Sequence, residues 1–118
     1  MAWMISFHPE FADEFANLPD GVKIELRAML ILLREVGYQL GRPYVDTLDG
    51  SKHANMKELR FKANDGVWRI AFAFDPKRDA ILLVGGDKSG VNQKRFYKSL
   101  IAKADARFEE HLKALKGE

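Results

Sequence analysis

Two segments near the N-terminus carry apolar residues at every third or fourth position, the spacing of helices with one buried face. In the first, Phe11, Phe15 and Leu18 follow Pro9, which suits the opening turn of a helix because its missing N–H would be unpaired there. The second stripe ends at Gly37, a residue type common at helix ends. It consists of Val22, Leu26, Met29, Leu30 and Leu33. The pattern therefore predicts two consecutive helices.

Elsewhere the apolar residues alternate with polar ones, the period of a half-buried strand. Residues 1–7 alternate in this way and predict a short first strand. Two further alternating segments, from Met56 onward and over Val67–Phe74, flank Asn64-Asp65-Gly66, which suits a tight hairpin turn. The unbroken apolar run Ala80–Val84 is typical of a strand covered on both faces. These three strands are predicted to form an antiparallel meander.

The C-terminal segment returns to helical spacing from about Asn92. Its apolar positions are Phe96, Leu100, Ala104, Phe108, Leu112 and Leu115. The segment 38–55 shows no sustained period and is predicted to be an ordered loop. The order strand, helix, helix, three antiparallel strands, helix predicts the α+β class, with helices packed on one face of a small, mostly antiparallel sheet. A chain of 118 residues is expected to form one domain over 1–118.

Composition narrows the chemistry. The absence of cysteine excludes disulfides, thiolate metal sites and cysteine nucleophiles. His8, His53 and His111 are scattered along the chain, so neither a metal nor another cofactor is expected. No apolar stretch approaches the roughly 20 residues needed to span a bilayer, and no signal-peptide pattern opens the chain. We therefore expect a cytoplasmic protein without a membrane partner.

The positions of the cations say more than their number, because 19 Lys+Arg against 17 Asp+Glu leave a net charge of only +2. If Leu59 and Phe61 face the core, Arg60, Lys62 and Arg69 share the opposite face of the hairpin. A two-residue loop at 64–65 sets Arg60 opposite Arg69, and a loop at 65–66 sets Lys62 there instead. Like charges directly opposite each other are destabilising. An anion bound at this face would compensate them.

The surroundings of this face suit a phosphate. Ala71 and Ala73 are small and predict a shallow concavity, and Gly85-Gly86 would let a ligand approach the backbone closely. The last helix opens with cations, where its dipole already favours an anion, and carries an aromatic residue able to stack on a base. The resulting cradle consists of Arg60, Arg69, Lys88, Lys94, Arg95 and Tyr97. The alternative is a solvated face neutralised by ordinary salt bridges to Glu58, Asp65 and Asp87.

Three segments in this order resemble a known family. They are Lys57-Glu58-Leu59-Arg60, then Val67-Trp68-Arg69-Ile70-Ala71-Phe72, then Leu82-Leu83-Val84-Gly85-Gly86-Asp87-Lys88-Ser89-Gly90. Together with the order of elements they resemble toxins of the RelE/ParE superfamily, and most closely its HigB-like branch in type II toxin–antitoxin systems. The resemblance covers nearly the whole chain and is weakest over 38–55.

The resemblance implies an mRNA interferase, a metal-independent endoribonuclease that cleaves mRNA on the ribosome by attack of a ribose 2′-hydroxyl on the adjacent phosphate. It also implies a cognate helix-turn-helix antitoxin as partner, with operator DNA bound only through the toxin–antitoxin complex. Some members of the superfamily act without catalysis, so a ParE-like inhibitor of DNA gyrase is the alternative.

The resemblance also assigns residues. Arg69 matches the hairpin arginine that contacts the scissile phosphate, and Arg60 and Lys88 match basic positions around it, with Tyr97 the nearest match to an aromatic residue on the last helix. Further RNA or phosphate contacts are expected from Lys57, Lys62, Lys94 and Arg95. RelE-type toxins carry two lysines before the hairpin, where this chain has Met56 and Glu58. The general base is therefore left open among Glu58, His53 and Tyr97.

Overall fold

The computed structural model describes residues 2–117, so the predicted start of the first strand at Met1 lies outside the described residues. The elements are β1 (Ile5–Phe7), α1 (Pro9–Ala16), α2 (Asp20–Val36), a 3-10 turn (Gly37–Gln39), β2 (Val45–Thr47), β3 (Met56–Ala63), β4 (Gly66–Phe74), β5 (Ala80–Asp87) and α3 (Gln93–Leu115). The predicted strands and helices thus occur in the predicted order, with one further strand, β2, in the segment predicted to be a loop. Within the described part of the chain, no helix combines the length and apolar character needed to cross a membrane.

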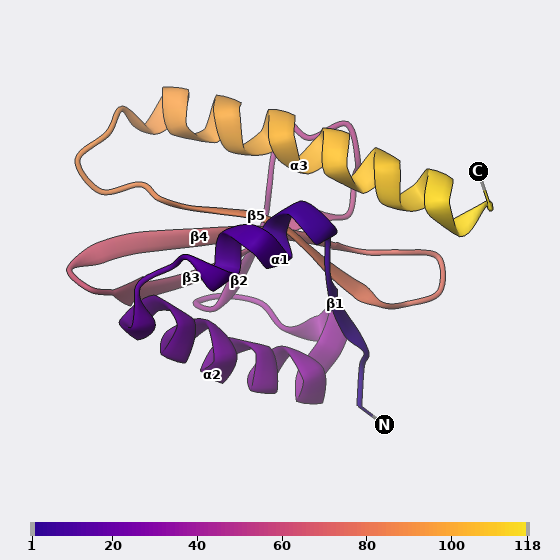
Figure 1. Ribbon diagram of the computed structural model, residues 1–118, viewed down its shortest axis with the longest axis horizontal. Coiled ribbons are helices and arrows are strands. Elements are labelled where there is room, and N and C mark those ends of the chain that lie inside the picture. The colour runs from indigo at the N-terminus through magenta and orange to yellow at the C-terminus, as the bar shows by residue number, and fades with distance from the viewer. Residues whose placement is uncertain (1, 118) are drawn as a thin grey trace.

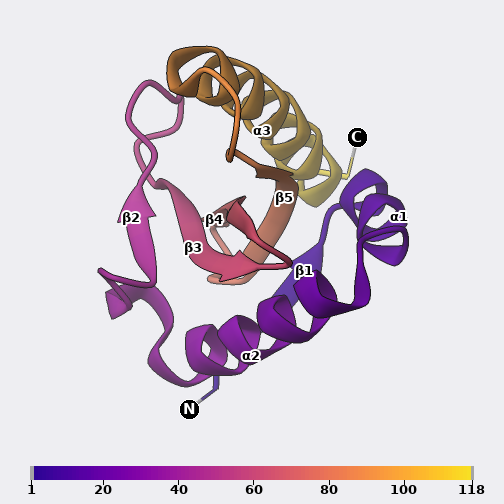
Figure 2. The ribbon, with the colours of Figure 1, turned by 90° about the vertical axis from the view of Figure 1, so that its left-hand side faces the viewer.

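The five strands form one sheet in the order β1-β5-β4-β3-β2. Only β1 and β5 are parallel, and every other neighbouring pair is antiparallel. In Figure 1 the sheet lies between α3 on one side and α2 on the other, and Figure 2 shows it curving between these helices. The α+β class and the mostly antiparallel sheet are therefore confirmed.

The expectation that all helices pack on one face of the sheet is wrong. One core joins α1 and α2 to the sheet through residues such as Phe11, Leu26 and Phe72. A second core joins α3 to the opposite face through Ala71, Leu100 and other buried side chains. The reason lies in β5, whose unbroken apolar run leaves both faces in need of cover.

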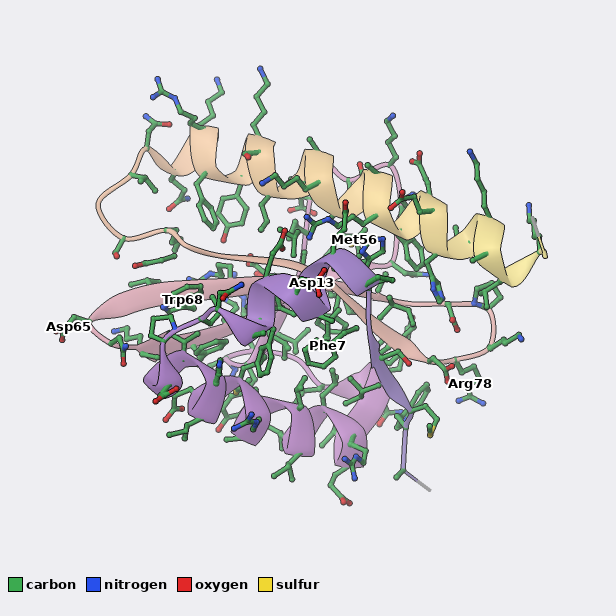
Figure 3. All side chains as sticks on the ribbon, viewed as in Figure 1. Phe7, Asp13, Met56, Asp65, Trp68 and Arg78 are labelled. Atoms are coloured by element: carbon green, nitrogen blue, oxygen red, sulfur yellow. The ribbon has the colours of Figure 1, made fainter. Side chains whose placement is uncertain are left out.

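The β3–β4 hairpin has the first of the two registers predicted for it. Arg60 pairs with Arg69, and Asn64 and Asp65 form the two-residue loop. Both loop residues have positive φ, 49° and 60°, as a type I′ hairpin turn requires. Figure 3 labels Asp65 at this hairpin tip and Arg78 in the β4–β5 turn, at opposite ends of the sheet.

The segment 38–55 contains a strand that its sequence does not predict. β2 is three residues long and pairs antiparallel with β3, with Asp46 opposite Glu58. Three residues are too few to display a period. The strand forms because the edge of β3 offers it backbone partners, and this pairing brings 42–49 alongside the cation-bearing face.

Two buried charged residues hold α3 against the sheet. Arg107 donates from Nη1 to the carbonyl oxygen of Leu83 at 2.8 Å and forms a two-nitrogen contact with the Glu14 carboxylate of α1. That hydrogen-bonded ion pair raises the pKa of Arg107 and lowers the pKa of Glu14. Asp105 accepts hydrogen bonds from Ser51 Oγ and the backbone N–H of Lys52. These contacts fix the position of α3, and with it the first turn that carries Tyr97.

Small side chains let α3 lie close to the sheet, which gives a testable stability difference. Ala104 is fully buried in the core that contains Ala71, whereas Ala106 on the same helix is exposed. Ala104→Leu should lower the free energy of unfolding by about 1–3 kcal/mol through overpacking, and Ala106→Leu should change it by less than about 0.5 kcal/mol. Urea unfolding measures both. Equal effects would mean that α3 does not pack in this way.

Candidate functional site

The candidate site lies on the α3 face of the sheet, at the end that carries the β3–β4 turn. β3 places Glu58 and Arg60 on this face because they are two residues apart in a strand. Arg69 on β4 is opposite Arg60, and α3 contributes Tyr97 from its first turns. Lys88 directly follows β5, and its backbone N–H bonds to the carbonyl oxygen of Val67. Four separate elements thus converge on one cluster.

Glu58, one of the predicted candidate bases, is buried in the cluster, with only 5% of the residue exposed. Arg69 Nε lies 3.8 Å from Oε1 and Arg60 Nε lies 4.0 Å from Oε2. Oε1 has no hydrogen-bond partner within residues 2–117. Burial raises the pKa of Glu58 above its ordinary value, although the Tyr97 hydroxyl and then both arginines act in the opposite direction. A buried carboxylate with an unsatisfied oxygen is suited to accept a proton from a ligand.

Arg69 lies buried in the centre of the cluster and not at its surface. Its Nε donates to Tyr97 Oη at 3.3 Å, and its Nη1 donates to the carbonyl oxygen of Trp68 at 2.9 Å. Only 5% of the residue is exposed. Burial, followed by the neighbouring Glu58 carboxylate, raises the pKa of Tyr97. Arg69 is therefore placed to orient Glu58 and Tyr97, while Arg60 offers more surface to an anion.

Lys88 faces the cluster from the loop after β5. Its Nζ lies 5.8 Å from the centre of the Tyr97 ring and donates to Gln93 Oε1 at 3.3 Å. Burial lowers the pKa of Lys88, and repulsion from Arg69 and Arg60 lowers it further. An ammonium group whose pKa is lowered gives up its proton more readily, which suits a general acid.

Arg42, Asp46 and Gln93 belong to the site although the sequence did not single them out. Arg42 Nε and Nη2 donate to Asp46 Oδ2 at 3.1 and 2.6 Å, and Arg60 Nη1 lies 3.7 Å from the same oxygen. The hydrogen bond from Arg42 lowers the pKa of Asp46 and raises that of Arg42. No sequence signal could have found Arg42 and Asp46, because only the pairing of β2 with β3 brings them here.

Two adjoining hollows open on this surface. The first, called the Glu58 cleft here, has a volume of about 410 Å³. It is lined by Arg42, Asp46, Thr47, Leu48, Asp49, Glu58, Arg60, Lys88, Gln93 and Tyr97. The second, called the Lys62 hollow here, has a volume of about 390 Å³. It is lined by Arg42, Pro43, Arg60, Phe61, Lys62, Val67 and Arg69. Arg42 and Arg60 border both.

Several residues predicted for the site lie away from this cluster. His53 packs edge-on against Phe108, with Nε2 3.3 Å from Glu109. Glu109 is about 18 Å along α3 from Tyr97 at 1.5 Å per residue. Lys57 has the opposite strand parity, and its Nζ lies over the Tyr38 ring. His53 therefore does not join the candidate bases, and Lys57 does not join the cationic face.

Lys94 and Arg95, the cations that open α3, are both exposed, and within residues 2–117 neither side chain forms a hydrogen bond or ion pair with the cluster. Arg95 is two residues before Tyr97, so at about 100° per residue the two side chains leave the helix on opposite sides. Lys94 leaves it about 60° from Tyr97 by the same count. Asn92 caps this helix through its Oδ1, which accepts the backbone N–H of Arg95.

The predicted concavity is filled in part by the chain itself. Ala71 and Ala73 are fully buried beneath α3. A side chain at Gly85 would meet Ile70 Cδ1, and one at Gly86 would meet Phe96. These small residues therefore make room for packing rather than for a ligand. The open part of the face begins at Glu58, Arg60 and Arg69.

One group of side chains within residues 2–117 has the spacing of a metal site, namely His8, Glu10 and Glu110. His8 Nδ1 accepts the backbone N–H of Glu10, so the proton of a neutral ring is on Nε2. That N–H points at Glu110 Oε1, 2.9 Å away. Because Nε2 has no free lone pair in this arrangement, the group fits a helix cap with a hydrogen bond to Glu110 better than a metal site.

The solved structures contain a related fold. A free-state structure of the Escherichia coli toxin RelE, with two arginines changed to alanine, superposes with a TM-score of 0.59. The match covers 87% of this chain and 97% of that one, at 15% sequence identity. The fold is therefore RelE-like, with the same class of sheet and helices.

Comparison of sequences gives the family. Residues 13–109 match the family described as phage derived protein Gp49-like (DUF891), and the chain belongs to this family. A Mycobacterium tuberculosis protein named "Putative toxin HigB3" is 54% identical over 81 residues, which cover 69% of this chain and 68% of that protein. A second, "Putative toxin HigB2" of the same organism, is 48% identical over 86 residues, covering 72% of this chain but only 42% of that protein. The resemblance to HigB-like toxins is thus confirmed.

Proposed function

We propose that this protein is the toxin of a type II toxin–antitoxin system and a metal-independent endoribonuclease that cleaves mRNA on the ribosome. The observation that carries the proposal is the buried Glu58 carboxylate, which has a raised pKa and an unpaired oxygen and lies between Arg60 and Arg69. Structural burial of an acid among cations costs stability, so its placement in an open cleft favours a chemical role. HigB-like relatives support the toxin assignment.

Glu58 is the proposed general base. The Glu58 carboxylate, which borders the cleft, takes the proton of a ribose 2′-hydroxyl, and the 2′-oxygen attacks the adjacent phosphorus. The bond from phosphorus to the 5′-oxygen then breaks, giving one RNA end with a 2′,3′-cyclic phosphate and one with a 5′-hydroxyl. A raised pKa makes Glu58 a stronger base than an ordinary glutamate while it remains ionised above that pKa.

The remaining roles follow from charge and exposure. Arg60 borders the cleft and would stabilise the negative charge that develops on the phosphate oxygens. Lys88 is the proposed general acid for the leaving 5′-oxygen, because its lowered pKa favours proton release. Tyr97, with its pKa raised, keeps its proton and is proposed to orient Glu58 and to contact a base. Arg69 acts through Glu58 and Tyr97 as a positioning residue.

The proposed partners follow from the proposed role as a type II toxin. The proposed antitoxin is a small helix-turn-helix protein that covers part of the cationic surface, and operator DNA is bound through the complex. The ribosome is the proposed site of cleavage because the resemblance to RelE-type toxins implies it and because the Glu58 cleft is small and open. A cleft of about 410 Å³ gives few contacts to position an RNA by itself.

Induction in bacteria tests this function. We expect growth arrest and new mRNA 5′-hydroxyl ends within translated codons, mapped by sequencing of RNA ends, with both effects reversed by the neighbouring antitoxin gene. Glu35→Gln, an exposed change on α2, serves as an active control. Growth arrest with intact mRNA, broken DNA and inhibited supercoiling would show gyrase inhibition instead, and unaffected growth would contradict both toxin activities.

A further inference from the structure

The two hollows beside the cluster differ sharply in charge. Three carboxylates, those of Asp46, Asp49 and Glu58, line the Glu58 cleft together with its cations. The Lys62 hollow has four cationic side chains and no carboxylate in its lining, and its remaining walls are apolar. Arg42, Arg60 and Arg69 each have a carboxylate within 4.0 Å outside this lining, whereas Lys62 has no ion-pair partner within residues 2–117. An unpaired lysine beside apolar walls suits a ligand that is both planar and anionic.

We propose that the Lys62 hollow is a subsite for the nucleotide next to the scissile phosphate of a single-stranded RNA. The base lies against Val67 and Pro43, and its phosphate is bound by Lys62 with help from Arg42. This inference rests on the proposed ribonuclease function, because it assigns the path of the same RNA beyond the Glu58 cleft.

Continuity between the hollows supports this path. Arg60 and Arg42 border both, so a strand leaving the Glu58 cleft meets the Lys62 hollow without crossing other surface. Arg60 and Lys62 are two residues apart on β3, which places them about 7 Å apart along the strand. That spacing is about the reach of one nucleotide in an extended chain, so the two cations can hold consecutive phosphates.

The state of the cations supports an anionic ligand. Arg60 and Arg69 are directly opposite each other, with Glu58 3.8–4.0 Å from both and Asp46 3.7 Å from Arg60, so no carboxylate contacts either cation closer than 3.7 Å within residues 2–117. Lys62 is exposed, and no ion pair within residues 2–117 involves it. Opposite Lys62 on β4 is Val67, an apolar half-buried residue rather than an acid. The half-buried valine offers a contact to a base, and the exposed, unpaired lysine beside it offers a contact to a phosphate.

Titration followed by NMR of the labelled protein tests the subsite. The probe is a 2′-deoxy trinucleotide, which lacks the attacking hydroxyl and so reports binding without cleavage. We expect amide shifts at Lys62 and Val67 as well as in the Glu58 cleft. Lys62→Glu should raise the Kd roughly tenfold, whereas Lys113→Glu, an equal change of charge on an exposed lysine at the far end of α3, should leave it within about twofold. Lys62→Ala should reduce the slope of log Kd against log salt by about 0.7.

A second set of titrations tests the proposed contact between the RNA base and Val67. A trinucleotide that lacks one terminal base should bind the wild-type protein more weakly and lose the Val67 shift while it keeps the Lys62 shift. Inorganic phosphate alone should shift Lys62 but not Val67. If Lys62→Glu and Lys113→Glu bind the trinucleotide equally, or if Val67 does not respond to the base, the subsite is wrong.

The test separates this inference from the proposed function. Lys62-dependent binding in a protein that produces no cleaved mRNA ends would retain the subsite and refute the ribonuclease. Cleaved ends together with Lys62-independent binding would retain the ribonuclease and refute the subsite. Binding of the antitoxin that depends on Lys62, without any binding of the trinucleotide, would assign the hollow to the protein partner and overturn the inference.

Discussion

Glu58→Gln is expected to reduce mRNA cleavage by about 10²–10⁴-fold, because glutamine keeps the shape of the side chain but cannot accept the 2′-hydroxyl proton. The measurement is the rate at which new 5′ ends appear on a translated message with purified ribosomes. Glu35→Gln makes the same chemical change on an exposed part of α2 and should leave the rate unchanged. Full activity of Glu58→Gln would remove Glu58 from the mechanism.

The pH dependence of the rate provides a second test of Glu58. A general base works in its deprotonated form, so the rate should rise with pH through the pKa of Glu58, level off, and fall again at higher pH where the general acid Lys88 loses its proton. Because burial raises this pKa, the rise should occur at higher pH than for an ordinary glutamate. Glu58→Gln should lack this limb, and a limb that persists in the variant would assign it to another group.

The free energy of unfolding should fall with rising pH over the range in which the cleavage rate rises. Since the folded-state pKa of Glu58 is raised, the protonated form is favoured by folding, and this contribution is present at low pH and lost as pH rises through the raised pKa. Glu58→Gln imitates the protonated form, so its advantage in the free energy of unfolding over wild type should grow across that range and then stay constant. Urea unfolding at several pH values measures it. A decline in this advantage with rising pH would show that the two arginines outweigh burial.

Arg69→Ala is expected to have the second-largest effect, a fall in cleavage of about 10²–10³-fold. The substitution removes the hydrogen bonds from Arg69 to Tyr97 and to the Trp68 carbonyl, and it takes one of two cations from Glu58. The pKa of Glu58 should therefore rise further and move the pH–rate profile to higher pH. Loss of these buried contacts should also cost about 1–3 kcal/mol of stability.

A double-mutant cycle distinguishes a positioning role from an independent one. If Arg69 acts through Glu58, Arg69→Ala should have little further effect on the rate in the Glu58→Gln background. Arg69→Lys keeps the charge without the two-sided geometry of the guanidinium and should restore the position of the pH profile but only part of the rate. Additive losses would instead mean that Arg69 contacts the phosphate directly. Unfolding curves of each variant establish that the proteins compared are folded.

Local signals in the sequence were strong enough to predict most of the elements. The helical stripes led to α1, α2 and α3, and Asn64-Asp65 marked the hairpin turn because these residues tolerate positive φ. The parity of Leu59 and Phe61 then placed Arg60 and Arg69 on one face, as the register confirms. β2 escaped prediction because its partners, rather than its own residues, make it a strand.

The arrangement of the helices shows where local reasoning fails. The apolar run in β5 already indicated two covered faces, yet which helix covers which face depends on long-range packing between α3 and Ala71, Leu83 and their neighbours. For the same reason, alanines expected to form a concavity are buried under α3, and His53 lies beside Phe108 instead of in the cleft. Sequence spacing says nothing about such distances.

The sequence by itself determined the class of fold, the family and the face of the sheet on which Arg60, Lys62 and Arg69 gather, because these follow from the two-residue period of strands and from short motifs. Only the tertiary structure decided that Glu58 is buried between two arginines with an oxygen unpaired, and that Arg42 and Asp46 join the site. The burial of Glu58 and the ion pairs around it arise where β2, β3, β4 and α3 meet. The pKa of an acid depends on that surrounding and not on its neighbours in the chain.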